Sequence, residues 1–234
     1  MQRNRLPFLL LILLLACFSC SGQRERIFKE TRLSPYTIVS ITASSGSEEQ
    51  AGKAINSAFR EMERAAAILN YYAPESEISV INKNAGVGPV KVSAETFELV
   101  DKAVFMARST DGAFDVTMGP VISLWDFQKK ILPDPDKLRE ALRRVGYSHI
   151  IMDRDSSTVY LDRKGMEINL GGIMKGYLAD KGVAALKREG IKTGIIAIGG
   201  DIKAFGRKPG GEPWRVGLQN PRQKGSSDEI IATV

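Results

Sequence analysis

The sequence predicts an α+β fold: a single mixed domain whose strands are mostly antiparallel. First, segments with helical periodicity are mixed with short β-branched segments typical of hairpins, and the two do not alternate regularly as they do in a doubly wound sheet. Second, 43% of the 234 residues are hydrophobic and 26% are charged, which is ordinary for a globular protein with its own core. Third, no internal repeat and no clear linker divides residues 32–234.

The N-terminus predicts a lipoprotein signal peptide over residues 1–16. Arg3 and Arg5 precede the apolar run from Leu6 to Ala16, which is too short to span a bilayer but suits a signal peptide. The run continues into Cys17 in a pattern similar to a lipobox, so Cys17 is the expected lipidation site, with Cys20 as a second candidate. An ordinary cleaved signal with two incidental cysteines is the alternative. Residues 17–31 are expected to hold the lipidated cysteine and a polar tether, followed by a domain over 32–234.

The first half of the domain predicts one strand and two long helices. Residues 36–42 are rich in β-branched side chains and are typical of a strand. Ser47 and Gln50 have capping-box spacing, and an apolar face follows to about Asn70, which predicts a helix. Residues 78–82 fit a short extended or helical turn. Ser93 is expected to cap a second helix that ends in the turn at 110–112.

The second half predicts a third helix, several short strands and a fourth helix. Asp134 and Pro135 begin a helix that should run through Val145 and end at Gly146. Short apolar runs bounded by turn residues are the expected strands, and they lie at 149–153, 158–162, 166–170, 193–198, 202–205, 214–219 and from 230 onward.

The stretch from Glu167 to Asp180 is the strongest candidate site in the sequence alone. A strand that turns through Gly171 and Gly172 into a helix presents backbone N–H groups and a helix dipole, the features of an anion site, most often for phosphate. A cation such as Lys175 in the first turn opposes the dipole unless a bound anion offsets it. The alternative is a close-packed corner with an exposed lysine.

The formal net charge of +6 does not indicate a nucleic-acid partner. Lys and Arg are scattered among acidic residues, with no long basic run, recognition helix or aromatic platform. We interpret the charge mainly as a solvated surface, with a smaller part available for a phosphate-bearing ligand.

Four segments, in this order, resemble the FAD:protein FMN transferase family, the ApbE-like lipoproteins. They are 72–79 with Asn82, 110–120 with 124–127, 169–177, and 199–202 with 213–216. The resemblance covers residues from about 32 to the end, and the four segments together behind a lipobox are far more specific than any one alone.

The resemblance implies a lipid-anchored, Mg²⁺-dependent enzyme on the periplasmic side of the cytoplasmic (inner) membrane. Such an enzyme would bind FAD, release AMP and transfer FMN to a threonine or serine hydroxyl of an acceptor flavoprotein subunit. That chemistry needs a cation and donors around the pyrophosphate and a base near the acceptor hydroxyl.

The resemblance also implies the site residues. Gly172 matches a position whose backbone carbonyl is a metal ligand. Asn169 stands where many members have Asp, and it keeps the acceptor oxygen while losing the charge. Asp201 would lie near the phosphates or support the glycine turns, and Trp125 matches a family tryptophan or packs in the core. The implied FAD contacts are Tyr72, Ala113, Phe114, Asp115, Asn169 and Lys175.

Two of these contacts have an alternative in the residues themselves: Tyr72 as an exposed aromatic at a helix end and Asp115 as a local cap. The family's downstream histidine and Asp-x-x-x-Thr segments do not occur before Val234, so we expect the domain to be C-terminally incomplete and assign no catalytic residue. His149 precedes the glycine turn and is expected to be an ordinary histidine at the start of a strand. The alternative functions are an FAD pyrophosphatase, which gives FMN and AMP, and a non-catalytic flavin-binding lipoprotein.

Overall fold

The computed structural model describes residues 24–34, 37–126, 129–222 and 230–234. The predicted signal peptide, Cys17 and Cys20 lie outside these ranges. Within them, no helix combines the length and the apolar character that crossing a bilayer requires.

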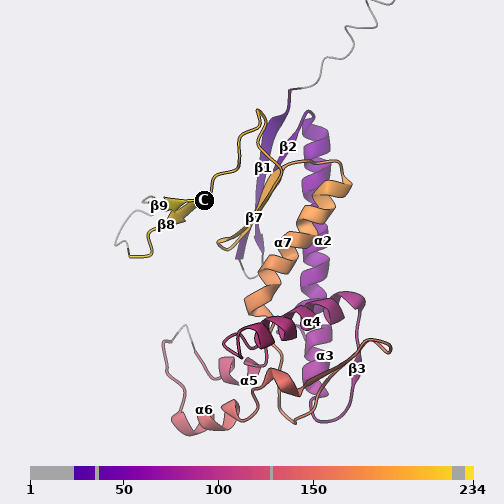
Figure 1. Cartoon of the computed structure of the whole chain (residues 1–234), viewed down its shortest axis with the longest axis vertical. Coiled ribbons are helices and arrows are strands. Elements are labelled where there is room, and N and C mark those ends of the chain that lie inside the picture. The colour runs from indigo at the N-terminus through magenta and orange to yellow at the C-terminus, as the bar shows by residue number, and fades with distance from the viewer. Residues whose placement is uncertain (1–23, 35–36, 127–128, 223–229) are drawn as a thin grey trace, which may run out of the picture.

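A four-stranded antiparallel sheet forms the upper part of the molecule (Figure 1). Its strand order is β1-β2-β6-β7. The buried side chains of β2 lie opposite those of β6, with Val39 beside Ile198 and Ile41 beside Ile196. One face of the sheet is therefore apolar. The strands are β1 (Arg26–Ser34), β2 (Thr37–Ser45), β6 (Gly194–Ile198) and β7 (Asp201–Phe205).

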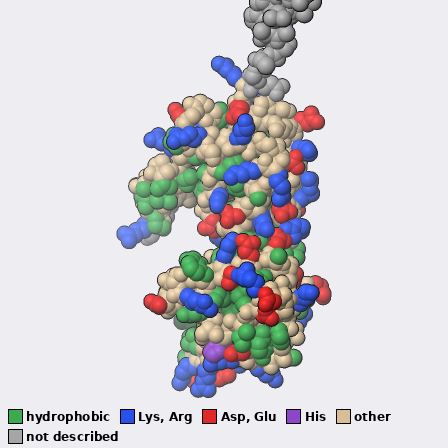
Figure 2. Space-filling model, turned by 45° about the vertical axis from the view of Figure 1, so that its right-hand side comes forward, with side chains coloured by type: hydrophobic (Ala, Val, Ile, Leu, Met, Phe, Trp, Pro, Cys, Tyr) green, Lys and Arg blue, Asp and Glu red, His purple; other side chains and the backbone are tan. Residues whose placement is uncertain are grey.

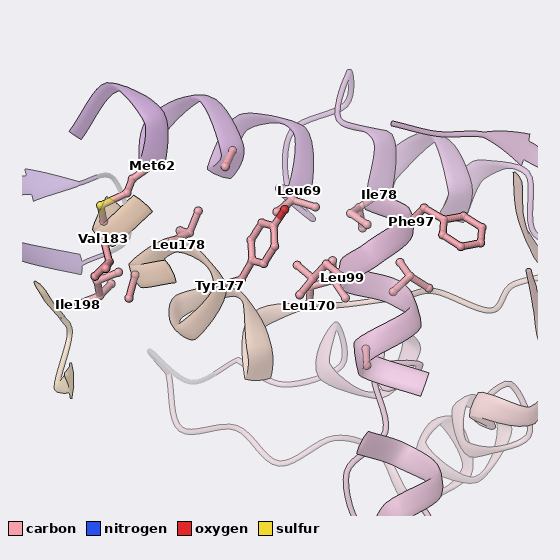
Figure 3. Close-up of a cluster of buried hydrophobic side chains, with 14 of the residues drawn as sticks. Met62, Leu69, Ile78, Phe97, Leu99, Leu170, Tyr177, Leu178, Val183 and Ile198 are labelled. Carbon is pink, nitrogen blue, oxygen red and sulfur yellow. The ribbon is translucent and has the colours of Figure 1, made fainter. Parts of the chain in front are cut away.

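Two long helices, α2 (Glu48–Leu69) and α7 (Gly171–Arg188), cover this apolar face. The Ser47 side chain accepts a hydrogen bond from the Gln50 backbone N–H and caps α2 as predicted. Gly190, with a φ of +84°, follows the end of α7. Figure 3 shows buried side chains of both helices meeting, among them Met62 and Leu178. This layer of side chains is the main part of the core.

The lower part of the molecule holds a small sheet and the shorter helices (Figure 1). The sheet has the order β3-β5-β4, and all its pairs are antiparallel. The elements of this lower part are α3 (Glu77–Lys83), β3 (Val90–Lys91), α4 (Ala94–Ser109), α5 (Gly119–Ile122), α6 (Pro135–Leu142), the 3₁₀ turn η1 (Tyr147–His149), β4 (Ile150–Asp153) and β5 (Thr158–Leu161).

A two-stranded hairpin, β8 (Gly217–Gln219) with β9 (Ile230–Thr233), projects from the side of the sheet (Figure 1). Both of its strands are exposed along their whole length. Figure 2 shows hydrophobic side chains at the surface of this projecting part, above an indentation between the two halves of the molecule.

The fold class is confirmed: the chain is a mixed α+β domain with antiparallel sheets. Several boundaries differ from the predictions, and β2 continues to Ser45, beyond the predicted end at residue 42. The third helix ends at Leu142, before Val145. The strand expected at 214–219 is confined to β8. Strand β1 begins at Arg26, so the folded domain includes residues that the sequence analysis placed in the tether.

The strand predicted at 166–170 was wrong. Its buried side chains do alternate, with Met166, Ile168 and Leu170 all in the core. However, Glu167 makes only an isolated bridge with Met118. The backbone of this segment bonds mainly to a side chain and to a loop, as described below, so the segment is extended without belonging to a sheet.

Candidate functional site

A pocket of about 550 Å³ lies where the end of β1, the start of β2, the second half of α2 and the first turns of α7 meet. In Figure 1 the first turns of α7 and the second half of α2 lie in the middle of the molecule, near the lower end of the large sheet. Its interior wall is apolar and comes from both helices and the sheet. The wall residues are Val39, Phe59, Met62, Ala66, Leu69, Met174, Leu178 and Ile198.

The polar lining of the pocket is concentrated at its rim. Arg32 of β1 and Lys175 of α7 contribute positive charge, and Glu63 of α2 contributes negative charge. The Arg32 guanidinium lies 4.0 Å from the centre of the Phe59 ring and hydrogen-bonds Glu30 at 2.8 Å. An apolar cavity with a few polar groups at its edge is the usual form of a site for a cofactor with an aromatic ring.

The segment that precedes α7 is held in place by Asn82. The Asn82 side chain accepts a hydrogen bond from the Ile168 N–H at 2.7 Å and donates one to the Ile168 carbonyl at 3.0 Å. The Asn169 N–H donates to the Val116 carbonyl at 2.7 Å. These bonds replace the sheet partners that the predicted strand would have had. They fix the point from which Asn169 and α7 enter the pocket.

The N-terminus of α7 has the features of an anion site. Helix α7 begins at Gly171, and no side chain caps it in the manner of Ser47 on α2. The Asn169 Oδ1 atom instead accepts from the Gly171 N–H at 2.9 Å. Asn169, Gly171 and Lys175 all line the pocket. The positive end of the helix dipole and a lysine ammonium therefore lie at one rim.

Lys175 forms an ion pair with Asp201 at the start of β7. Both side chains are about half exposed, at 41% and 55%. The pair connects the first turns of α7 with the Gly199-Gly200 turn of the sheet. Asp201 therefore lies beside the expected phosphate position as a partner of Lys175.

Two adjacent tyrosines stand at the end of α2 and line the pocket. The Tyr71 hydroxyl donates a hydrogen bond to the Glu167 carboxylate, while Tyr72 is 69% exposed. Burial, with a smaller contribution from Glu167, raises the pKa of the Tyr71 hydroxyl above its ordinary value. The two rings meet edge to face, with their centres 5.0 Å apart. Tyr72 was predicted as a site residue, but Tyr71 was not, and no role was predicted for Glu167 within the 167–180 stretch.

The predicted residues Ala113, Phe114 and Asp115 lie beside α7 but are not part of the pocket lining. The Phe114 ring packs against Gly172, where an added Cβ would lie 3.1 Å from the ring. Asp115 accepts hydrogen bonds from the Thr117 N–H at 2.8 Å and from the Tyr147 N–H at 3.0 Å. Asp115 therefore joins its own turn to the start of η1.

The described residues do not make up a complete Mg²⁺ site. Mg²⁺ requires about six oxygen ligands in near-octahedral geometry. Within the ranges that the structure covers, no group of three or more His, Cys, Asp or Glu side chains could hold a metal ion. The candidate ligand oxygens around the start of α7 belong to the Gly172 carbonyl, to Asn169 and to Asp201. Asn169 already accepts a hydrogen bond from the Gly171 N–H, and Asp201 pairs with Lys175.

Two other residues considered from the sequence lie outside the pocket lining. His149 is in the turn before β4, and its ring lies 3.0 Å from Asp162, in agreement with its interpretation as an ordinary strand-start histidine. Trp125 is 37% exposed and is not part of the pocket lining. Tyr71 could have been suspected from the Tyr71-Tyr72 doublet. Glu167 carries no sequence signal, because its role depends on a contact 96 residues away.

Comparisons with known proteins identify relatives that match most of this chain. The chain is 29% identical to the FAD:protein FMN transferase of Treponema pallidum over 92% of this chain and 64% of the relative. It is 32% identical to that of Klebsiella pneumoniae over 70% of this chain and 50% of the relative. The chain therefore spans about half to two thirds of the length of these curated relatives.

Solved structures show the same fold. The ApbE protein of Thermotoga maritima matches with a TM-score of 0.81 and 28% identity, over 89% of this chain and 67% of that protein. The flavin transferase ApbE of Vibrio cholerae matches with a TM-score of 0.74 and 25% identity, over 84% and 65%. The ApbE family model matches residues 36–234, which is most of the sequence. The chain belongs to the ApbE family.

Proposed function

We propose that this chain binds FAD in the α7 pocket and transfers FMN from it to a protein acceptor. The observation that carries the proposal is the pocket itself, which joins an apolar interior and two tyrosines to a helix N-terminus and Lys175. An aromatic ring fits the first part, and a pyrophosphate fits the second. The relatives named as FAD:protein FMN transferases support the same reaction.

The proposed reaction is a phosphoryl-group substitution on the FAD pyrophosphate. A threonine or serine oxygen of the acceptor attacks the phosphorus on the FMN side and forms a phosphoester bond. The bond between that phosphorus and the bridging oxygen breaks, and AMP leaves with the electron pair. The hydroxyl proton passes to a base or to solvent. Among the described residues we assign no base.

The residues of this chain would bind and orient FAD. The ammonium group of Lys175 and the positive end of the α7 dipole would face the pyrophosphate, and Asn169 would hold the cofactor from the adjoining segment. Tyr72 would lie against a ring of FAD, because its exposed face is at the pocket rim. Ala113, Phe114 and Asp115 would contribute by shaping the far side of Gly172, against which Phe114 packs.

Mg²⁺ dependence is a separate proposal, with the Gly172 carbonyl as one ligand. The described residues do not supply the remaining ligands, so the cation must be varied as an independent component of the assay.

Binding can be tested with two lysine variants of the same helix. Lys175→Met should weaken FAD binding by roughly tenfold, because a charge-assisted interaction with phosphate is lost. Lys187→Met is the matched control near the other end of α7, and it should leave the affinity unchanged. Equilibrium dialysis with FAD measures both. Equal FAD affinities of the Lys175→Met and Lys187→Met variants would contradict the placement of the pyrophosphate at this rim.

Turnover separates the candidate functions. The protein is incubated with FAD, an acceptor protein that offers a Thr or Ser hydroxyl, and Mg²⁺ or EDTA. Covalent flavin on the acceptor together with AMP is the expected result. Release of AMP and FMN without covalent flavin on the acceptor would contradict the transferase proposal and support an FAD pyrophosphatase. Bound FAD with neither product would leave the non-catalytic binder.

We further propose that the chain is anchored by a lipid on Cys17 at the periplasmic side of the inner membrane, where its acceptor would be a flavoprotein subunit. The basis is the lipobox-like sequence, which lies outside the described residues. In cells fed labelled palmitate, Cys17→Ser should abolish the label and release the protein from the membrane fraction, whereas Cys20→Ser should not. The reverse result would move the anchor to Cys20.

A further inference from the structure

A contact between two distant segments fixes one wall of the pocket. The Tyr71 hydroxyl, at the end of α2, donates a hydrogen bond to Glu167, which lies in the extended segment before α7. Tyr71 is partly buried and packs against the core, so its ring is held along its length as well as at its tip. The ring therefore connects two parts of the chain that both border the pocket.

The backbone around the acceptor residue is held by hydrogen bonds, and the Glu167 carbonyl itself accepts one from the Gly119 N–H at 3.3 Å. The neighbouring residue Ile168 is clamped by the Asn82 side chain through both its N–H and its carbonyl. Asn169, two residues after Glu167, lines the pocket. Glu167 is therefore tied to the same rigid segment as a proposed FAD contact.

The backbone on the other side of the contact is also fixed. The Asn70 Oδ1 atom accepts from the Tyr72 N–H at 2.9 Å, and the Ser79 hydroxyl donates to the Tyr71 carbonyl at 3.1 Å. With the backbone held, the orientation of the Tyr72 ring depends on its side-chain torsions and on what the ring touches. The ring touches Tyr71 edge to face, at an interplanar angle of 89°.

We propose that Glu167 and Tyr71 are positioning residues for the flavin cofactor. Glu167 fixes the Tyr71 ring, and the Tyr71 ring sets the angle at which Tyr72 meets a ring of FAD at the pocket rim. The proposal rests on the proposed function and deepens it. It assigns a role in FAD binding to two residues that need not contact the pyrophosphate, where the reaction takes place.

Three variants test the chain of contacts. Tyr71→Phe removes only the hydroxyl and should weaken FAD binding about threefold, because the ring that Tyr72 packs against is no longer held at its tip by Glu167. Glu167→Leu removes the acceptor and should have a similar effect. Glu167→Gln keeps an acceptor oxygen for the Tyr71 hydroxyl and should restore near wild-type affinity. Tyr160→Phe, the same chemical change in β5 outside the pocket lining, is the matched control and should change nothing.

A double-mutant cycle distinguishes positioning from general loosening of the fold. Tyr72→Ala alone should weaken FAD binding by about tenfold, and in that background Tyr71→Phe should cost nothing further. Thermal unfolding verifies that each variant is folded. If Glu167→Leu does not fold, Tyr71→Phe alone tests the loss of the hydrogen bond. The measurement is the FAD dissociation constant by equilibrium dialysis.

The outcomes separate the inference from the function on which it rests. Suppose that wild-type protein binds FAD and that Tyr71→Phe raises the FAD dissociation constant by the same factor in the wild-type and the Tyr72→Ala backgrounds. The positioning role is then overturned, and the proposed function stands. The same holds if Glu167→Gln fails to rescue. If wild-type protein does not bind FAD, both proposals fail together.

Discussion

At the scale of single residues, Asn82 illustrates how one side chain can replace a strand. Its amide bonds both backbone groups of the buried residue Ile168, at 2.7 and 3.0 Å. Unsatisfied buried backbone groups cost about 1–3 kcal/mol each, so Asn82→Ala should lower the free energy of unfolding by about 2–4 kcal/mol. Urea unfolding measures this change.

Asn84→Ala is the control for this prediction. Asn84 is half-buried, but its hydrogen bond is exposed to solvent: its amide donates to the Val80 carbonyl at 2.8 Å within one helical turn. Its removal should change the free energy of unfolding by less than about 0.5 kcal/mol, because water replaces the bond. A similar loss for both variants would show that the Ile168 groups find other partners.

At the scale of elements, an ion-pair network joins three helices. Glu95 of α4 lies 2.7 Å from Arg64 of α2 and 2.6 Å from Lys181 of α7. The hydrogen bond from Arg64, and then the contacts with Lys181, lower the pKa of Glu95 from 4.5 to about 2 against the opposing effect of burial. The charged carboxylate is therefore favoured in the folded protein.

The sign of the resulting pH dependence follows from that lowered pKa. The stabilisation by Glu95 is fully present above pH 4.5 and is lost as the pH falls from 4.5 towards 2. Because the ion pairs of Glu95 with Arg64 and Lys181 remain partly solvated, we expect Glu95→Gln to lower the free energy of unfolding by about 1–2 kcal/mol at pH 7 and by much less at pH 2.5. Urea unfolding of both proteins across this range measures the difference.

Glu98→Gln in the same helix is the control for this pH dependence. The pair of Glu98 with Lys102 is half exposed, at 54% and 53%, so its removal should cost less than about 0.5 kcal/mol at either pH. A Glu95→Gln cost that is independent of pH would show that packing, rather than charge, joins the three helices.

The contact between the long helices and the sheet depends on Gly182 in α7. An added Cβ there would lie 2.5 Å from the Ile196 Cδ1 atom and 2.7 Å from the Met62 Sδ atom, and both side chains are buried. Gly182→Ala should therefore destabilise the fold by about 1–3 kcal/mol despite the higher helix propensity of alanine. The midpoint of thermal unfolding measures the change.

Gly176 in the same helix provides the opposite expectation. An added Cβ at Gly176 would meet nothing within 4 Å, so Gly176→Ala should stabilise the protein by about 0.5–1 kcal/mol through helix propensity alone. Stabilisation by both substitutions would mean that Ile196 and Met62 repack freely around the new methyl group.

The same elements show which parts of the fold were predictable from sequence. Helices α2 and α4 were predicted because their buried residues follow a helical period and a serine caps each. Strand β1 was not predicted because its pattern is inverted: Leu33 is 85% exposed, while Glu30 and Arg32 are half buried. The segment at 166–170 has the alternation of a strand, but its backbone partners are distant in sequence and therefore invisible to periodicity.

The candidate site divides in the same way. Asn169, Lys175 and Tyr72 were predicted because they belong to short motifs, and the structure brings all three to one pocket. The apolar interior was not predicted, since residues such as Phe59 and Met62 look like ordinary core positions of α2 in the sequence. Tyr71 and Glu167 were missed because only the fold brings them together.

At the scale of the whole molecule, stability should be concentrated around the large sheet. Strands β2 and β6 are paired on both sides and covered by α2 and α7. The β8–β9 hairpin has only two strands, and its residues Leu218, Ile230 and Ile231 are 47%, 58% and 59% exposed. An isolated two-stranded hairpin is marginally stable at best, so the hairpin should open without unfolding the sheet.

Hydrogen exchange measures this difference directly. Amides of β2 and β6 should exchange only through global unfolding, those of the edge strand β1 should exchange sooner, and those of β8 and β9 should exchange fastest. Urea well below the unfolding midpoint should accelerate β2 and β6 but leave the hairpin rates nearly unchanged, because hairpin opening exposes little new surface. Equal protection of β9 and β2 would show that the hairpin is bound to the sheet or to another surface in solution.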